Sequence, residues 1–202
     1  MNVLELAPTE TDIALANGTP PRLVRYDPTV QEPDFLFEVI DGFIVRKTVG
    51  ARGIRISSTL QGFLGSFVCV NKLGRTFGQL GYDLPGGGPK RKPDVSFLSE
   101  SRWPRNREFP PGDFVPTVPE LAVEVISPHE LAHVMFAKLE QYFRAGASAV
   151  WLVIPHIERV YCYDSPTAVR ILTRDDELTG DPAIPGFRMP VAYLFPTMDA
   201  SS

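Results

Sequence analysis

The run Ala149–Ile154 constrains the fold more than any other segment of this sequence, because every residue in it is apolar. A short continuous apolar run predicts a strand that is buried on both faces. Further strands are expected at 35–39, 43–48, 76–84, 94–98 and 121–126, helices at 52–73 and from Ser127 to about Ala145, and a closing hairpin at 159–163 and 169–173. This order of elements predicts a mixed α/β domain rather than a helical bundle or a β-sandwich.

The chain has 202 residues, which favours a single domain. Residues 1–33 are rich in proline and small polar residues and predict an irregular arm. The domain is expected at 34–196, with a tail at 197–202. The net charge of −4 argues against a protein that coats nucleic acid nonspecifically, but it leaves room for a basic surface around an acidic site.

The two cysteines, Cys69 and Cys162, both lie in apolar segments and lack CxxC spacing. They are predicted to be buried, reduced thiols, which is typical of a cytoplasmic protein. The first residues lack the basic start and apolar run of a signal peptide, and no apolar stretch is long enough for a membrane span.

Two carboxylates and one lysine are the candidate chemical groups. Glu124 shares one face of its expected strand with Ala122 and Ile126, so an unpaired charge there is costly. Asp94 begins another strand, and Lys138 falls in the apolar stripe of the following helix. Converging carboxylates can hold a divalent cation beside a phosphate, and a nearby ammonium can offset charge in phosphodiester hydrolysis. The alternative is a structural ion pair between Glu124 and Lys138, with Asp94 capping a turn.

A competing motif, His129-Glu130-Leu131-Ala132-His133, matches the HExxH pattern of zinc metalloproteases. Two features count against zinc. Ser127, Pro128 and Glu130 resemble a capping box at a helix start, and position 136 is Phe rather than the Gly of one protease extension. His156 and Glu158 are the conceivable third ligands. A zinc metalloprotease is therefore the less favoured alternative, beside two histidines on the surface.

Basic residues flank Asp94 on both sides and could bind phosphates. They are Lys90, Arg91, Lys92, Arg102, Arg105 and Arg107. Trp103 among them could stack on an unpaired base. The alternative is an ordinary solvated loop.

Three segments together resemble one family. They are the run 93–97, the run 119–128, and Lys138-Leu139-Glu140-Gln141-Tyr142 followed by Gly146 and the run 150–153. The chain resembles, over roughly residues 35–195, the Uma-type family of restriction-endonuclease-like proteins within the PD-(D/E)xK nuclease superfamily. The resemblance implies a restriction-endonuclease-like core in which a mixed sheet is flanked by helices.

The resemblance also implies a site: Asp94 and Glu124 as ligands of Mg²⁺ or Mn²⁺, with DNA as the substrate. The superfamily lysine two residues after the glutamate is absent, because position 126 is Ile. The resemblance implies that a lysine in the following helix, Lys138, takes its place. Glu38 matches the family pattern as a third acidic contributor. The family's histidine near the first long helix is replaced by Arg52-Gly53.

Two function classes follow from this resemblance. The first is an endonuclease that cuts DNA with a divalent cation, expected as a homodimer because two strands favour two active sites. The second is a catalytically silent module that binds nucleic acid or protein on the same fold.

Overall fold

The computed structural model describes residues 24–30, 33–47, 49–128 and 130–196. Residues 1–23 of the expected arm and the expected tail at 197–202 lie outside the described residues. Within the rest of the arm, Val24–Arg25 forms a short strand, β1, paired antiparallel with β3 (Phe43–Arg46). This pairing shows that a proline-rich segment can still add a strand to a sheet edge.

A six-stranded sheet lies at the centre of the molecule, in the order β12-β11-β10-β9-β7-β4. Its strands are β4 (Gly74–Gly78), β7 (Val95–Ser99), β9 (Leu121–Val125), β10 (Ala149–Ile154), β11 (Arg159–Ser165) and β12 (Ala168–Leu172). Only the β9–β10 pair is parallel, and the others are antiparallel. The predicted mixed sheet is therefore present.

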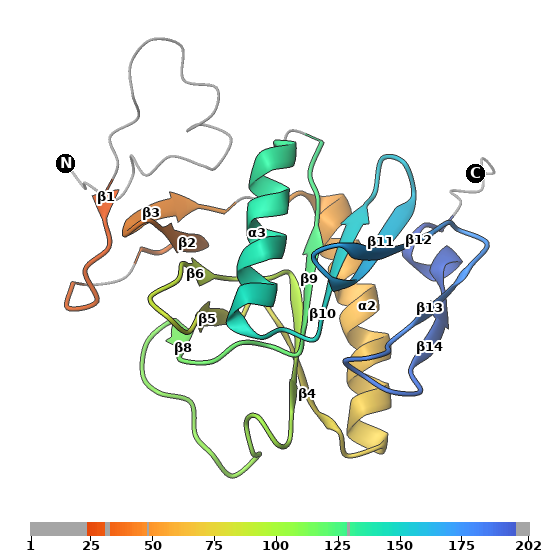
Figure 1. Cartoon of the computed structure of the whole chain (residues 1–202), viewed down its shortest axis with the longest axis horizontal. Coiled ribbons are helices and arrows are strands. Elements are labelled where there is room, and N and C mark those ends of the chain that lie inside the picture. Colours follow the sequence, from red (N-terminus) through yellow and green to blue (C-terminus); the bar gives the residue numbers. More distant parts are fainter. Residues whose placement is uncertain (1–23, 31–32, 48, 129, 197–202) are drawn as a thin grey trace.

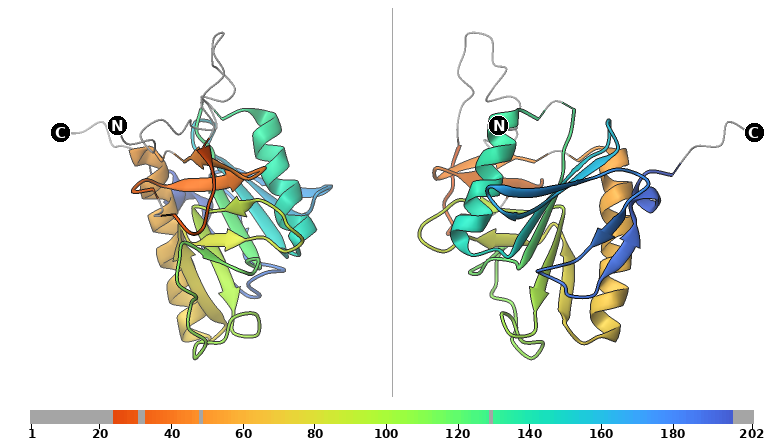
Figure 2. Two further views of the ribbon diagram at one scale, coloured as in Figure 1. Left: turned by 90° about the vertical axis from the view of Figure 1, so that its left-hand side faces the viewer. Right: turned by 45° about the vertical axis from the view of Figure 1, so that its right-hand side comes forward.

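Two helices cover opposite faces of this sheet, α2 (Ala51–Val70) and α3 (Ala132–Ala145) (Figures 1 and 2). Strand β10 shows why both are needed. Trp151 and Val153 belong to the same core cluster as the buried residues of α2, whereas Val150 and Leu152 belong to the cluster that contains Leu139 of α3. The apolar run is buried on both faces, as its sequence predicts.

Helix α2 follows the predicted periodicity closely. Ile56, Leu60, Leu64 and Val68 recur every four residues and are all buried against the sheet. The two cysteines behave differently from each other: Cys162 is buried in β11, but Cys69 is exposed near the end of α2. The prediction of two buried thiols is wrong for Cys69, because that position faces away from the apolar stripe.

A second six-stranded sheet has the order β1-β3-β2-β6-β5-β8. Its remaining strands are β2 (Phe37–Ile40), β5 (Gly81–Asp83), β6 (Lys90–Arg91) and β8 (Phe114–Val115). The turn between β2 and β3 has positive φ at both Asp41 and Gly42, as expected for a tight hairpin. β6 and β8 lie in segments for which the sequence predicts no strand.

The expected strand at 76–84 is two strands in different sheets. Gln79 between them has φ +55°, a left-handed conformation that ends β4 and redirects the chain into β5. As a result, the chain segment that follows α2 contributes to both sheets.

Helix α3 begins at Ala132, several residues later than expected, and Leu131 is its N-cap. The predicted capping box is wrong. Glu130 lies before the helix, and its carboxylate contacts Lys138 at 3.2 Å instead of closing the helix start. The helix ends as expected, with Gly146 in the left-handed conformation at φ +100°.

The chain continues past the hairpin of β11 and β12 into a small two-stranded sheet and a short 3-10 helix. These elements are β13 (Glu177–Thr179), β14 (Arg188–Pro190) and η2 (Val191–Leu194). Val191 and Leu194 join the core cluster on the α2 side of the central sheet. Neither α-helix in the described part of the chain combines the length and the apolarity needed to cross a bilayer.

Candidate active site

Strand register brings the two predicted carboxylates together. β7 and β9 run antiparallel with Val95 opposite Val123, so Asp94, one residue before β7, comes opposite Glu124. Opposite residues of an antiparallel pair project from the same face. Both side chains are buried, with residue exposures of 3% for Asp94 and 2% for Glu124.

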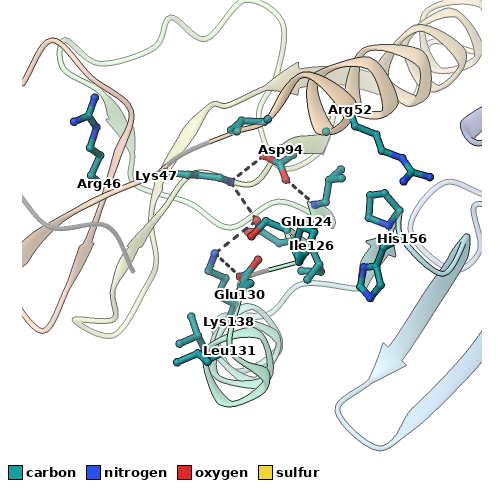
Figure 3. Close-up of a pocket in the computed structure, with 18 residues that line it drawn as sticks. Arg46, Lys47, Arg52, Asp94, Glu124, Ile126, Glu130, Leu131, Lys138 and His156 are labelled. Atoms are coloured by element: carbon teal, nitrogen blue, oxygen red, sulfur yellow. Dashed lines mark hydrogen bonds and ion pairs between the residues drawn. The ribbon is translucent and has the colours of Figure 1, made fainter. Parts of the chain in front are cut away.

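The paired carboxylates line a cavity of about 210 Å³. Its wall is formed by the ends of β3 and β9, the first turn of α2, and the inner side of α3, with Pro155 and His156 beyond β10. The ionisable groups around it are Asp94, Glu124 and Glu130, together with Arg46, Lys47, Arg52, Lys138 and His156. The cavity therefore combines a buried acidic pair with a rim rich in cations (Figure 3).

Lys47 lies closest to the acidic pair, and sequence reasoning missed it. Its Nζ lies 3.1 Å from Asp94 Oδ1 and 3.2 Å from Glu124 Oε2, so one ammonium bridges the two carboxylates (Figure 3). Lys47 directly follows β3, and its backbone N–H donates to the carbonyl of Leu36. A lysine at a strand end carries no local signal of this role, because the contact depends on how two sheets meet.

Neutral donors hold the two carboxylates in place. The Gln79 side-chain amide donates to Asp94 Oδ1 at 2.7 Å, and the Val125 backbone N–H donates to Asp94 Oδ2 at 2.6 Å. The Tyr142 hydroxyl donates to Glu124 Oε1 at 2.9 Å. Each carboxylate is thus oriented by a group that carries no charge.

Lys138 reaches the same cluster from α3, as its place in the apolar stripe predicts. Its Nζ lies 3.2 Å from Glu130, 3.8 Å from Glu38 and 3.9 Å from Glu124. The structure therefore brings Lys138 to the acidic pair, although Glu130 is its nearest acidic contact.

Glu38 of β2 lies beside this cluster and is not among the described residues that line the cavity. Arg91 Nη1 donates to its Oε2 at 2.7 Å, and the Lys92 backbone N–H donates to its Oε1 at 2.9 Å. These contacts tie β2 to β6 and place a negative charge next to Lys138. The structure positions Glu38 as a partner of buried cations.

Burial and charge act in opposite directions on these acids. Burial raises the pKa of Glu124 to about 7, against the opposing effect of Lys47 and Lys138. Burial also opposes the ionisation of Glu38, but Lys138, Arg91 and Lys47 together hold its pKa well below the usual range. For Lys47, burial is outweighed by Asp94 and Glu124, which raise its pKa.

Three of the six predicted phosphate-binding residues lie in or next to β6 and are engaged within the protein. Arg91 and Lys92 are buried, Arg91 against Glu38 and Gln141, and Lys92 against Asp113. Lys90 pairs with Asp83. The prediction that these residues bind phosphates placed them on a loop, whereas each has an acidic partner within the protein, and Arg91 and Lys92 are buried.

The other three, in the loop after β7, also have protein partners. Arg102 pairs with Glu120 at 3.0 Å, Arg105 pairs with Glu100 at 3.3 Å, and the Arg107 guanidinium lies 3.7 Å from the centre of the Trp103 ring. None of the six is among the described residues that line the cavity. The basic residues there are Arg46, Lys47, Arg52, Lys138 and His156 instead.

Trp103 is only 2% exposed and stacks on Phe109, with 5.4 Å between the ring centres. The interpretation of Trp103 as a platform for an unpaired base is wrong, because its faces are already covered. It anchors the loop after β7 to the core.

The HExxH motif does not form the continuous helical face that a zinc site needs. Its first histidine, His129, lies outside the described residues, Glu130 precedes α3, and His133 lies in the first turn of α3. Among the described residues, no group of three or more His, Cys, Asp and Glu side chains is arranged to hold a metal ion.

The acidic pair nevertheless has the donor chemistry of a Mg²⁺ or Mn²⁺ site. Carboxylate oxygens are the ligands these hard cations prefer. Lys47 shows that the space between Asp94 and Glu124 accepts positive charge, because an ammonium already lies there. The pKa of Glu124 is raised because the nearby lysines do not fully offset the effect of burial. A further cation beside this carboxylate would favour its ionised form. Asp94 and Glu124 thus fit a divalent cation.

Comparisons with known proteins agree with this fold. The sequence profile of the Uma2 family, described as "Putative restriction endonuclease", matches residues 10–192. A crystal structure titled as that of "a putative nuclease belonging to DUF820" from Anabaena variabilis superposes with a TM-score of 0.72 and 20% identity, covering 82% of this chain and 93% of that chain. No curated protein matches the sequence. The predicted restriction-endonuclease-like α/β fold is confirmed.

Proposed function

The chain belongs to the Uma2 family, and from this membership we propose that it is a nuclease that hydrolyses phosphodiester bonds in DNA with a divalent cation. The observation that carries the proposal is the pairing of Asp94 and Glu124 at a cavity rimmed by cations. Acidic ligands suit a metal ion, and the surrounding cations suit a polyanionic substrate.

Asp94 and Glu124 would hold Mg²⁺ or Mn²⁺. When bound, such an ion supplies a Lewis acid that polarises a phosphate oxygen and makes water easier to deprotonate. The protein's own contribution is orientation: Gln79 and Val125 fix the carboxylate of Asp94, and Tyr142 fixes that of Glu124. A carboxylate held in one rotamer loses less freedom when it binds a cation.

In the proposed reaction, a water oxygen forms a bond to phosphorus while the bond between phosphorus and the leaving sugar oxygen breaks. The water gives up a proton, and the leaving oxygen takes one up. A lysine ammonium would offset the negative charge that develops on the phosphate. Lys138, which the sequence indicates for this role, and Lys47 both line the cavity beside Glu124. Arg46, Arg52 and His156 would bind neighbouring phosphates at the rim.

A catalytically silent binding module is the second candidate, and one observation favours it. Lys47 already supplies a positive charge between the two carboxylates, so the folded protein does not depend on a metal to neutralise them. Metal-dependent cleavage separates the two candidates. A homodimer, which would present two sites to the two strands of a duplex, belongs to the nuclease proposal.

The test is cleavage of supercoiled plasmid DNA by the full chain with Mg²⁺, with Mn²⁺ and with EDTA. Cleavage is expected only with a metal ion. Glu124→Gln and Asp94→Asn are expected to lower the rate by about a hundredfold or more, because each removes a charged ligand without changing side-chain size. Circular dichroism of each variant checks that it is folded. Cleavage that survives in EDTA, or in both variants, would contradict the proposal.

A further inference from the structure

We propose that Lys47 is the lysine that acts on the scissile phosphate, and that its ammonium occupies the position between Asp94 and Glu124 until a divalent cation displaces it. The inference rests on the proposed function, since it concerns the same acidic pair. It assigns a role to a residue that is not one of the family positions identified in the sequence.

Distance is the first reason. Lys47 Nζ is 3.1 Å and 3.2 Å from the two carboxylates, whereas Lys138 Nζ is 3.9 Å from Glu124. Lys138 lies closer to Glu130 and Glu38 than to Glu124. Its charge is therefore shared among three acids, whereas the ammonium of Lys47 forms ion pairs with both members of the acidic pair.

The attachment of Lys47 is the second reason. Its backbone N–H is fixed by the Leu36 carbonyl at the end of the β2–β3 hairpin, while its side chain lines the cavity and is 10% exposed. The same ammonium also donates to the Lys92 carbonyl. Only the flexible side chain has to move for the ammonium to leave the carboxylates, and the backbone stays in place.

Electrostatics makes the displacement necessary. A divalent cation between Asp94 and Glu124 would lie within a few ångströms of the Lys47 ammonium, and like charges at that distance repel strongly where water is largely excluded. A phosphate entering the cavity offers the displaced ammonium a new anionic partner. Beside that phosphate, the Lys47 ammonium would offset negative charge.

This role predicts that Lys47→Met changes metal binding and catalysis in opposite directions. Metal binding should tighten, because the competing ammonium is gone, and phosphodiester hydrolysis should slow, because the phosphate loses its cation. A lysine that only stabilises the fold would weaken both when removed. A lysine that only blocks the metal site would improve both.

Isothermal titration of the full-length protein with Mn²⁺ measures the first effect. Lys47→Met is expected to bind Mn²⁺ about tenfold or more tightly than wild type, which is a modest share of the repulsion between close like charges. Lys138→Met is the matched control, since it removes one buried ammonium from the same cavity but not from between the carboxylates. The affinity of Lys138→Met for Mn²⁺ should change less.

Single-turnover cleavage measures the second effect. The rate for Lys47→Met, at saturating Mn²⁺, should fall by about a hundredfold or more.

Wild-type protein provides a readout that does not depend on the variants folding. The chain has only five lysines, so the Nζ signals of ¹⁵N-lysine-labelled protein can be assigned one by one. Titration with Mg²⁺ should shift the Lys47 signal and speed its exchange with water, with a smaller change at Lys138. An unchanged Lys47 signal at saturating Mg²⁺ would overturn the inference.

The outcomes separate this inference from the proposed function. If wild type binds Mn²⁺ and cleaves DNA but Lys47→Met binds Mn²⁺ no more tightly, the displacement is refuted and the nuclease proposal stands. If Lys47→Met binds more tightly and also cleaves faster, Lys47 is only a blocker and its catalytic role is refuted. If neither protein binds Mn²⁺, the metal site fails, and both proposals fail with it.

Discussion

Burial disfavours the ionised form of Glu124, whereas the nearby Lys47 and Lys138 favour it. Its residue exposure is 2%, and burial raises its pKa to about 7. Glu38, in contact with the same Lys138, has a pKa well below the usual range because three cations surround it. The pKa values of two glutamates in one cluster are therefore shifted in opposite directions. Arg91 adds a third cation beside Glu38, whereas the neighbouring Asp94 and Glu38 oppose the ionisation of Glu124.

The pH dependence of stability should reveal the raised pKa of Glu124. Since its folded pKa lies above the ordinary value of 4.5, its contribution is fully present below pH 4.5 and is lost as the pH rises to about 7. Between these limits the unfolding free energy of wild type should fall by roughly 1–3 kcal/mol relative to Glu124→Gln, which cannot ionise.

Urea denaturation of both proteins in EDTA, from pH 4.5 to pH 8, measures this difference. Glu38 does not disturb the comparison, because its pKa is lowered and its effect on stability appears below pH 4.5. Parallel curves for the two proteins would show that Glu124 has an ordinary pKa.

At the scale of elements, each part of the site arrives on a different segment. The β2–β3 hairpin supplies Lys47, β9 supplies Glu124, and α3 supplies Lys138. Asp94 comes from the segment just before β7, and Glu130 from the segment before α3. The geometry of the site consequently depends on how the central sheet meets the hairpin, more than on any one element.

The pairing of β4 with β7 is one such dependence, and Gly74 is its most crowded position. A Cβ at Gly74 would press on the carbonyl oxygen of Leu98 and lie 2.8 Å from the Ser99 Cα. Backbone atoms cannot move aside without breaking the ladder. Gly74→Ala should therefore lower the unfolding free energy by roughly 2–4 kcal/mol.

Gly62→Ala is the control for this prediction, since Gly62 lies in α2 and nothing described is within 4 Å of the added Cβ. It should raise stability by about 0.5–1 kcal/mol through helix propensity. Chemical denaturation of both variants gives the comparison. Equal stability of the two variants would mean that the β4–β7 edge can relax around an added methyl group.

At the scale of the whole molecule, charge is distributed unevenly. The net charge is −4, yet five cationic or histidine side chains line one cavity. The basic residues around β6 and after β7 instead neutralise acids or pack on rings within the protein. Exposed positive charge is thus present at the rim of this cavity, on Arg46 and Arg52.

Arg52 should contribute to the binding of duplex DNA. Its side chain is 53% exposed at the cavity, and its carboxylate partner, Glu158, is 3.8 Å away. Arg52→Ala should weaken duplex DNA binding and reduce the slope of log affinity against log salt by about 1.

Fluorescence anisotropy with labelled duplex DNA in EDTA, at several salt concentrations, measures this slope. Arg105→Ala is the matched control: Arg105 is also exposed and paired with a glutamate, Glu100, but it does not line the cavity. An equal loss of affinity in both variants would place the DNA elsewhere on the surface.

The sequence alone was sufficient for everything that depends on local periodicity. The alternation in β9 placed Val123 and Glu124 on opposite faces, the four-residue spacing in α2 defined its buried stripe, and the unbroken apolar run predicted a strand covered on both sides. It also placed Lys138 on the inner face of α3. These features follow from the backbone geometry of a single element, which neighbouring residues encode.

Tertiary structure alone decided which polar side chains meet. Lys47, Gln79 and Tyr142 contact the acidic pair from three separate segments of the chain, and none of these contacts has a local signature. The same is true of the cations. No local sequence feature tells Arg91 and Arg52 apart, yet Arg91 is buried against Glu38, whereas Arg52 lines the cavity. The physical reason is that strand register and the junction of two sheets, not spacing along the chain, determine the distance between charges.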